Sequence, residues 1–142
     1  MARGIPRAVI DQLREVALLA QCNRSELRRI AQLGTHLSVR KGEVLTRQGR
    51  PGREFFLVRD GRARCLVDGT EVAELGPGDY FGEMALLDGG PRHATVIAEG
   101  PMEVLVLERR EFWSLLDTAP SIAKKLLVAL ARREREDAEI RS

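Results

Sequence analysis

Apolar and polar positions divide the chain into a helical zone, a glycine-punctuated zone and a second helical zone. From Val9 to Leu33 apolar residues recur at spacings of three and four, which is the period of an amphipathic helix. The pattern predicts helices over about residues 6–33. A second helix is expected to begin at Ser25, whose hydroxyl can cap free backbone amides.

The middle zone, about residues 34–108, is broken by many glycines into short segments that alternate or are rich in β-branched and aromatic residues. Such segments predict strands. Asp60-Gly61 and Asp68-Gly69 are dipeptides that suit tight hairpin turns. Many short strands with regular turns predict a β-sandwich, barrel or jelly roll. Strands are expected at residues 36–39, 55–58, 63–67, 94–97 and 104–107.

The helical period returns after Leu107, so helices are predicted over about residues 109–140. Pro120 suits the first turn of the last helix, where its missing N–H does no harm. The end of this helix, from Arg132 to Arg141, is almost wholly charged and is expected to be a solvated face. An apolar stripe is expected at Ile122, Leu126, Leu127 and Leu130.

Composition narrows the possible functions. The 142 residues suit a single domain, residues 1–142, and the net charge of +2 does not favour a nucleic-acid partner. The two cysteines form no C-x-x-C pair and two histidines cannot supply a His-rich metal site, so neither a metal nor a cofactor is expected. No nucleophile elbow or Ser-His-Asp arrangement appears, which argues against an enzyme. No long apolar run or signal peptide is present, which predicts a cytoplasmic protein without a membrane partner.

One segment, Phe81 to Val96, departs from the strand pattern. It opens with Gly82, runs through a helix-forming turn and ends in Gly-Gly-Pro before a strand resumes. Free amides at the start of a helix can bind an anion. Arg92 adjoins an apolar strand, and an inward guanidinium needs an anion such as phosphate, whose oxygens its planar fork matches. Glu83 offers a carboxylate to a sugar hydroxyl, so the segment predicts a ligand with one phosphate charge and a free ribose hydroxyl.

The sequence Phe-Gly-Glu-x-Ala-Leu-Leu-x-x-x-Pro-Arg-x-Ala-Thr-Val resembles the phosphate-binding cassette of the cyclic nucleotide-binding domain family. That family includes the sensor domains of the bacterial cAMP receptor protein and of the regulatory subunits of cAMP-dependent kinase. The resemblance extends from about residue 10 to residue 138. It implies a mainly β fold, a jelly-roll β-barrel (double-stranded β-helix) with N-terminal helices and a C-terminal helical lid. It also implies cAMP, or alternatively cGMP, as the ligand.

The resemblance further implies a role for each cassette residue. Glu83, with the Gly82 backbone, would accept from the ribose 2′-hydroxyl, and Arg92 would pair with the phosphate charge. The residue after Arg92 is usually small in members that bind nucleotide, whereas here it is His93, whose ring is able to crowd the pocket or to contact the base. An Asp137 carboxylate would accept from the adenine amino group and repel the guanine carbonyl, which favours cAMP. The complete predicted set is Gly82, Glu83, Met84, Ala85, Arg92, His93 and Ala94 for the ligand, with the amides of Met84, Ala85 and His93 donating to phosphate, and Cys65, Val72 and Asp137 for the base.

Several alternatives stay open on the sequence. Glu83 and Arg92 could form a structural ion pair that only closes the barrel. The fold could be a degenerate one that serves as a protein-interaction domain, or the sensor part of a longer transcription regulator. About a dozen residues follow Leu130, too few for a helix-turn-helix, so no DNA-binding element is expected within this chain. The last helix, from Pro120 to about Ile140, is expected to report occupancy to a second copy of the chain or to a regulated protein partner.

Overall fold

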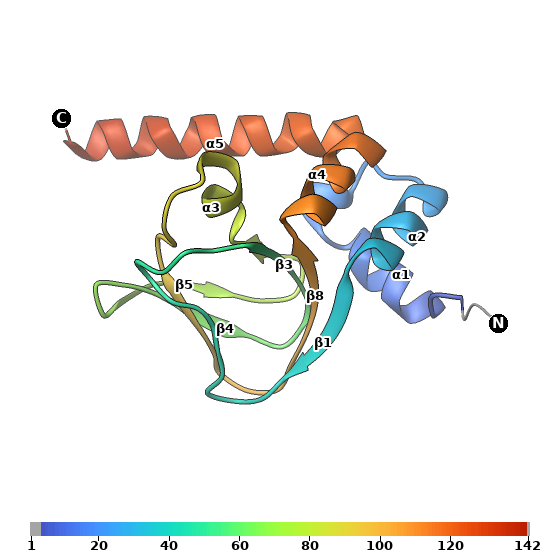
Figure 1. Cartoon of the computed structure of the whole chain (residues 1–142), viewed down its shortest axis with the longest axis horizontal. Helices are drawn as coiled ribbons and strands as arrows, with labels where there is room; N and C mark the ends of the chain where they lie inside the picture. The colour runs from blue at the N-terminus through green and yellow to red at the C-terminus, as the bar shows by residue number, and fades with distance from the viewer. Residues whose placement is uncertain (1–3, 142) are drawn as a thin grey trace.

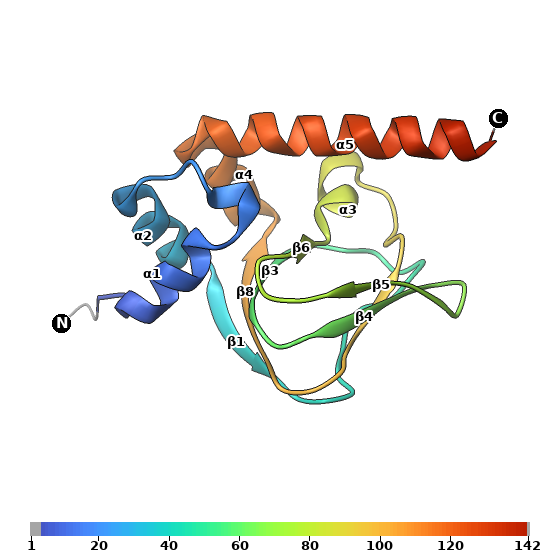
Figure 2. The ribbon, with the colours of Figure 1, turned by 180° about the vertical axis from the view of Figure 1, so that it is seen from behind.

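The computed structural model describes residues 4–141, with side chains described for residues 4–132. Helices from both ends of the chain gather on one side of a β-barrel, and the long last helix extends beyond them (Figure 1). The reverse view in Figure 2 shows the same division between helices and barrel. The three zones predicted from the hydrophobic pattern are therefore the three parts of the fold.

The N-terminal helices are α1 (Arg7–Arg14), the 3₁₀ turn η1 (Ala17–Leu19) and α2 (Arg24–Leu33). The cap of α2 is Asn23, whose side-chain oxygen accepts from the Glu26 amide at 2.8 Å, while the Glu26 carboxylate accepts from the Asn23 amide at 2.9 Å. The prediction that Ser25 caps this helix is wrong, because Ser25 already lies inside the first turn. Asn23 and Glu26 together satisfy two free amides, which a lone serine hydroxyl cannot do.

Replacing Asn23 with alanine is expected to lower the free energy of unfolding by about 1 kcal/mol, the usual contribution of an N-cap side chain. Urea denaturation followed by circular dichroism measures the change. Ser25→Ala is the matched control and should leave stability nearly unchanged. An equal loss in both variants would show that the capping box does not stabilise α2.

Residues 4–141 contain eight strands, and their pairings form two four-stranded antiparallel sheets, β1-β8-β3-β6 and β2-β7-β4-β5. Strands far apart in sequence are neighbours, since β1 pairs with β8 and β2 with β7. The predicted jelly-roll β-barrel with flanking helices is confirmed. The strands are β1 (Thr35–Val39), β2 (Val44–Thr46), β3 (Glu54–Asp60), β4 (Ala63–Val67), β5 (Thr70–Leu75), β6 (Tyr80–Phe81), β7 (Thr95–Ala98) and β8 (Met102–Glu108).

The two predicted turns have different outcomes. Asp68 and Gly69 have φ values of 52° and 79° and join the paired strands β4 and β5, as a tight hairpin with two left-handed residues requires. Asp60-Gly61 instead connects β3 to β4, which belong to different sheets. The hairpin predicted there is wrong: the left-handed Gly61 (φ 85°) turns the chain from one sheet to the other.

Strands β3 and β8 are buried on both faces, which joins the barrel to the helices. Phe55 and Leu57 face the helical core, where the Phe55 ring lies 4.9 Å from that of Phe112. The alternate residues Phe56 and Val58 face the barrel core. Because side chains alternate along a strand, this continuous apolar run supplies two separate cores.

The C-terminal helices are α4 (Arg109–Thr118) and α5 (Pro120–Arg141). Ile122 and Leu126 are buried in the helical core, as the stripe predicted. Leu127 is 68 % exposed, so its assignment to that stripe is wrong. Val128 is also exposed, so the packing of α4 and η1 against α5 leaves some of its apolar residues uncovered. None of the helices within residues 4–141 has the length and apolar character that crossing a bilayer requires.

Candidate functional site

A short helix, α3 (Glu83–Asp88), interrupts the barrel between β6 and β7. Gly82 precedes it in the left-handed conformation, with φ of 94°. A Cβ added to Gly82 would lie 2.7 Å from both Nη1 of Arg92 and the carbonyl oxygen of Glu54. Only glycine combines this backbone conformation with so close an approach, which explains the glycine at the start of the segment.

Arg92 points inward, as the sequence predicted for it, and is 6 % exposed. Its Nη1 donates to the Gly82 carbonyl at 3.0 Å, and its Nη2 donates to the Glu54 carbonyl at 2.8 Å. Gly52 presses against the same guanidinium, because a Cβ added there would overlap Nε, Cζ and Cδ of Arg92. Backbone from two segments, residues 52–54 and Gly82, therefore frames one buried cation.

The electrostatics of the site centre on this cation. Burial lowers the pKa of Arg92 from its ordinary value, and the nearby carboxylates of Glu54 and then Glu83 act in the opposite direction. Arginine keeps its proton throughout the physiological range, so the site holds a permanent positive charge. Glu83 is itself buried, at 6 % exposure. The attraction between Glu83 and Arg92, on which the structural alternative rests, is compatible with a binding role.

Arg92 also borders a hollow of about 500 Å³. Its volume falls within the range of small-molecule sites. The rest of the lining comes from β2 and the loop before β3, and the cassette residues Met84, Ala85 and His93 are not part of it. Arg92 therefore borders this hollow and also contacts the start of α3 through the Gly82 carbonyl.

Comparisons with known proteins assign the family. The family model described as "Cyclic nucleotide-binding domain" matches residues 36–119. The chain belongs to the cyclic nucleotide-binding domain family. A cAMP-dependent protein kinase regulatory subunit from Emericella nidulans is 36% identical over 115 residues, which cover 80% of this chain and 28% of that protein. The chain thus spans less than a third of that relative's length.

Solved structures agree with this assignment. The cAMP-bound PfPKA-R structure is similar with a TM-score of 0.82 and 31% identity, over 92% of this chain and 45% of that one. The catabolite activator protein of Thermus thermophilus is similar with a TM-score of 0.77 and 34% identity, over 87% of this chain and 61% of the other. The predicted family resemblance is therefore confirmed.

The remaining predicted residues of this cyclic nucleotide-binding domain lie in different surroundings. Cys65 on β4 is half-buried and packs against the barrel core. Val72 on β5 is 58 % exposed. The His93 side chain is exposed, so its ring does not fill the barrel interior. The Ala94 carbonyl accepts from the Thr46 hydroxyl at 3.0 Å and so ties β7 to β2. The side chain of Asp137 lies outside the described residues.

Two residues at the site were missed from the sequence, Gly52 and Glu54. Their contribution is made by the backbone: Glu54 gives a carbonyl oxygen to Arg92, and Gly52 gives room for its guanidinium. A partial signal exists, since Gly49 and Gly52 stand close together just before an apolar strand, and such glycines often mark a close backbone approach. The partner that approaches cannot be read from that signal.

Proposed function

We propose that this domain binds a cyclic nucleotide, cAMP in preference to cGMP, at Arg92 and Glu83, and that it acts as a cytoplasmic regulatory sensor without enzymatic activity. The observation that carries the proposal is the buried guanidinium of Arg92, held beside α3 by two backbone carbonyls. The name of the Emericella nidulans relative and the description of PfPKA-R as cAMP-bound support cAMP as the ligand.

Unused donors on the Arg92 guanidinium support a role in binding phosphate. Its two hydrogen bonds to Gly82 and Glu54 use two of the five N–H donors of a guanidinium. The carbonyls orient the fork without neutralising its charge, since they are uncharged. A cyclic phosphate placed between Arg92 and the amides of Met84 and Ala85 would receive a charge-assisted pair together with donors at the start of α3.

Glu83 supplies the sugar contact in this proposal. Its carboxylate lies at the first position of α3 and is buried near Arg92. An ionised carboxylate has about four acceptor positions, so it can accept from a ribose 2′-hydroxyl in addition to its existing contacts. Cys65 and Val72 would then border the base, with Val72 losing its present exposure when the ligand binds.

A route from the ligand to α5 is available through packing. Leu86 of α3 is buried in the helical core together with Phe112 and Leu115 of α4 and Ile122 and Leu126 of α5. A ligand that moves α3 would therefore change the packing of both C-terminal helices. The ligand can shift them only as far as its affinities for the two arrangements differ. A second copy of the chain or a protein partner would receive the signal.

Trp113 offers a direct test of this route. It is the only tryptophan of the chain, and its ring lies edge-on to Phe112 at 5.8 Å. Saturation with cAMP is expected to change Trp113 emission at the concentration at which binding occurs. Leu86→Ala should reduce the amplitude of that change while cAMP still binds, whereas Leu37→Ala, at an exposed position on β1, should leave it intact. An unchanged emission on binding would contradict the route.

Calorimetric titration with cAMP and cGMP tests the binding proposal and its base preference together. We expect one equivalent of cAMP to bind, and cGMP to bind more weakly. Asp137→Asn should reduce the difference in affinity between cAMP and cGMP, because the amide no longer repels the guanine carbonyl. An unchanged ratio of cAMP to cGMP affinity would show that Asp137 does not set the base preference. No binding of either nucleotide would favour the alternative of a degenerate, protein-interacting fold.

A further inference from the structure

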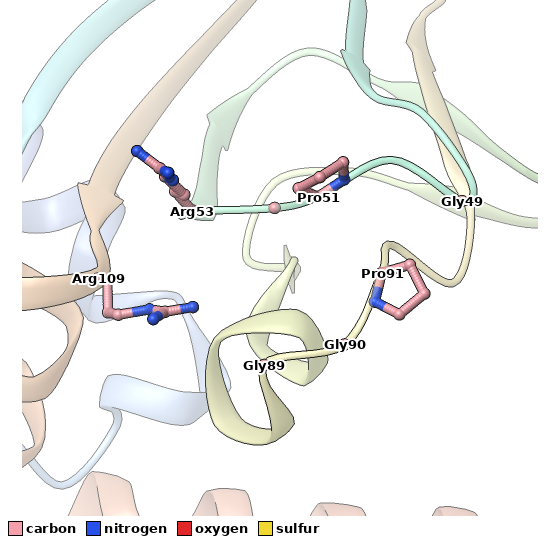
Figure 3. Close-up of a pocket in the computed structure, with 8 residues that line it drawn as sticks. Gly49, Pro51, Arg53, Gly89, Gly90, Pro91 and Arg109 are labelled. Atoms are coloured by element: carbon pink, nitrogen blue, oxygen red, sulfur yellow. The ribbon is translucent and has the colours of Figure 1, made fainter.

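A second hollow, of about 400 Å³, adjoins the one at Arg92 and is also lined by Gly52 (Figure 3). Its walls are the loop residues 49 and 51–53 and the turn at residues 89–91, which an isolated bridge between Pro51 and Pro91 holds together. Arg53 and Arg109 lie at the same end of it in Figure 3, where the Arg109 side chain points toward the turn and the Arg53 side chain points away from it. No carboxylate is part of this lining.

Strand register explains why two arginines lie at the same end of this hollow. Glu54 of β3 is paired with Glu108 of β8 in antiparallel register. Arg53 precedes Glu54 and Arg109 follows Glu108. The two arginines therefore lie opposite each other where the paired strands β3 and β8 end. Like charges placed directly opposite each other are destabilising. Among the side chains of residues 4–132, the ion pair within 4 Å is Arg62–Glu74, so neither Arg53 nor Arg109 is neutralised by a described carboxylate.

The adjoining hollow at Arg92 increases this concentration of positive charge. The two hollows share Pro51, Gly52 and Arg53. Together their linings hold five arginines and one glutamate, a formal charge of +4 within a chain whose net charge is +2. The arginines are Arg47, Arg50, Arg53, Arg92 and Arg109.

We propose that the hollow between residues 49–53 and 89–91 binds a polyphosphate group through Arg53 and Arg109. Neighbouring strands lie about 4.8 Å apart, and both arginine side chains are exposed, so each can rotate to bind one of two linked phosphoryl groups. A guanidinium fork matches phosphate oxygens bidentately. A single carboxylate would neutralise one of the two arginines and leave the other repelled. The concave wall of glycine and proline leaves space for the phosphate chain.

This site is separate from the proposed cyclic nucleotide site but connected to it through backbone. The Arg92 amide donates to the Arg50 carbonyl at 2.9 Å, and the Gly49 amide donates to the Arg92 carbonyl at 2.9 Å. An occupant of the outer hollow would bear on the loop that frames Arg92. Any resulting effect on cyclic nucleotide affinity must be reciprocal.

Calorimetric titration of inorganic tripolyphosphate into the full chain tests the proposal, in magnesium-free buffer at low ionic strength. We expect one equivalent to bind, with an affinity that falls as salt is added. Arg53→Gln/Arg109→Gln should weaken binding by about tenfold or more. Arg28→Gln/Arg29→Gln removes the same charge from the exposed face of α2 and should leave binding unchanged. Thermal melting verifies that both variants fold.

The outcomes are distinct from those of the cyclic nucleotide titration. The comparison of the two double variants needs no cyclic nucleotide, so it stands even if none binds. Equal weakening of tripolyphosphate binding in both double variants would show a general charge effect and overturn the proposed site. Absence of tripolyphosphate binding to the unmodified chain would also overturn it. Loss of tripolyphosphate binding in Arg92→Ala, with retention in Arg109→Gln, would place the anion at Arg92 and also overturn it. Adenosine triphosphate binding more tightly than tripolyphosphate would identify a nucleoside polyphosphate as the ligand, and equal affinity would identify the phosphate chain itself.

Discussion

Replacing Arg92 with alanine is expected to weaken cAMP binding about thirtyfold or more. Truncating one partner of a buried charge pair costs about 2–5 kcal/mol, and 2 kcal/mol corresponds to roughly thirtyfold in affinity. The cAMP affinity of Arg92→Lys should lie between those of the unmodified protein and Arg92→Ala, because an ammonium restores the charge without the planar fork. Equilibrium binding of cAMP to each variant measures the effect.

The same substitution has a structural effect that must be measured separately. Arg92→Ala removes a hydrogen-bond donor from the carbonyls of Gly82 and Glu54 and removes the attraction of the guanidinium for Glu83. A buried polar group left unpaired costs about 1–3 kcal/mol, so urea denaturation should accompany the titration. Arg64→Ala, at an exposed position on β4, is the control for loss of an arginine. Undiminished affinity in a folded Arg92→Ala protein would end the proposal of a phosphate-binding arginine.

Gly52→Ala is expected to weaken cAMP binding about tenfold or more without removing any polar group. The added methyl group would overlap the Arg92 guanidinium, which is buried and held by two hydrogen bonds. Overpacking of this kind costs about 1–3 kcal/mol, and the guanidinium must shift to relieve it. A shift of the phosphate-binding fork lowers affinity by an amount of that order.

Gly100→Ala is the matched control, since a Cβ added at Gly100 has no neighbour within 4 Å. It should change neither affinity nor stability appreciably. In an Arg92→Ala background, Gly52→Ala should cause little further loss, because the two positions act on the same group. Additive losses would show that Gly52 affects binding by a different route.

Local patterns accounted for much of the fold. The strand predicted at Ala63–Val67 has the bounds observed for β4, and the apolar run at Phe55 marked a strand that is buried on both faces. Strands β2, β5 and β6 were not predicted. β5 lies in the sheet by pairing with β4, although its side chains are mostly exposed, so it lacks the apolar alternation by which strands are recognised. β6, Tyr80–Phe81, is two residues long, too short for any period to show.

The errors at Ser25, Gly61 and Leu127 have a shared cause. Each residue has the chemistry that its predicted role needs, but a partner elsewhere decides whether that role is taken. Asn23, not Ser25, occupies the N-cap position of α2. β4 pairs with strands of the other sheet. α4 and η1 cover only part of the apolar face of α5. Residue chemistry alone does not contain these choices.

By itself the sequence determined the succession of helices and strands, the inward arginine and the cassette around it, because these depend on residue type and on spacing over a few positions. Only the tertiary structure decided that Gly52 and the Glu54 carbonyl frame Arg92, and that Arg53 and Arg109 lie at one end of the same hollow. Both arrangements depend on contacts between segments distant in sequence. Backbone carbonyls and strand register, which every residue type can provide, leave no mark in the order of side chains.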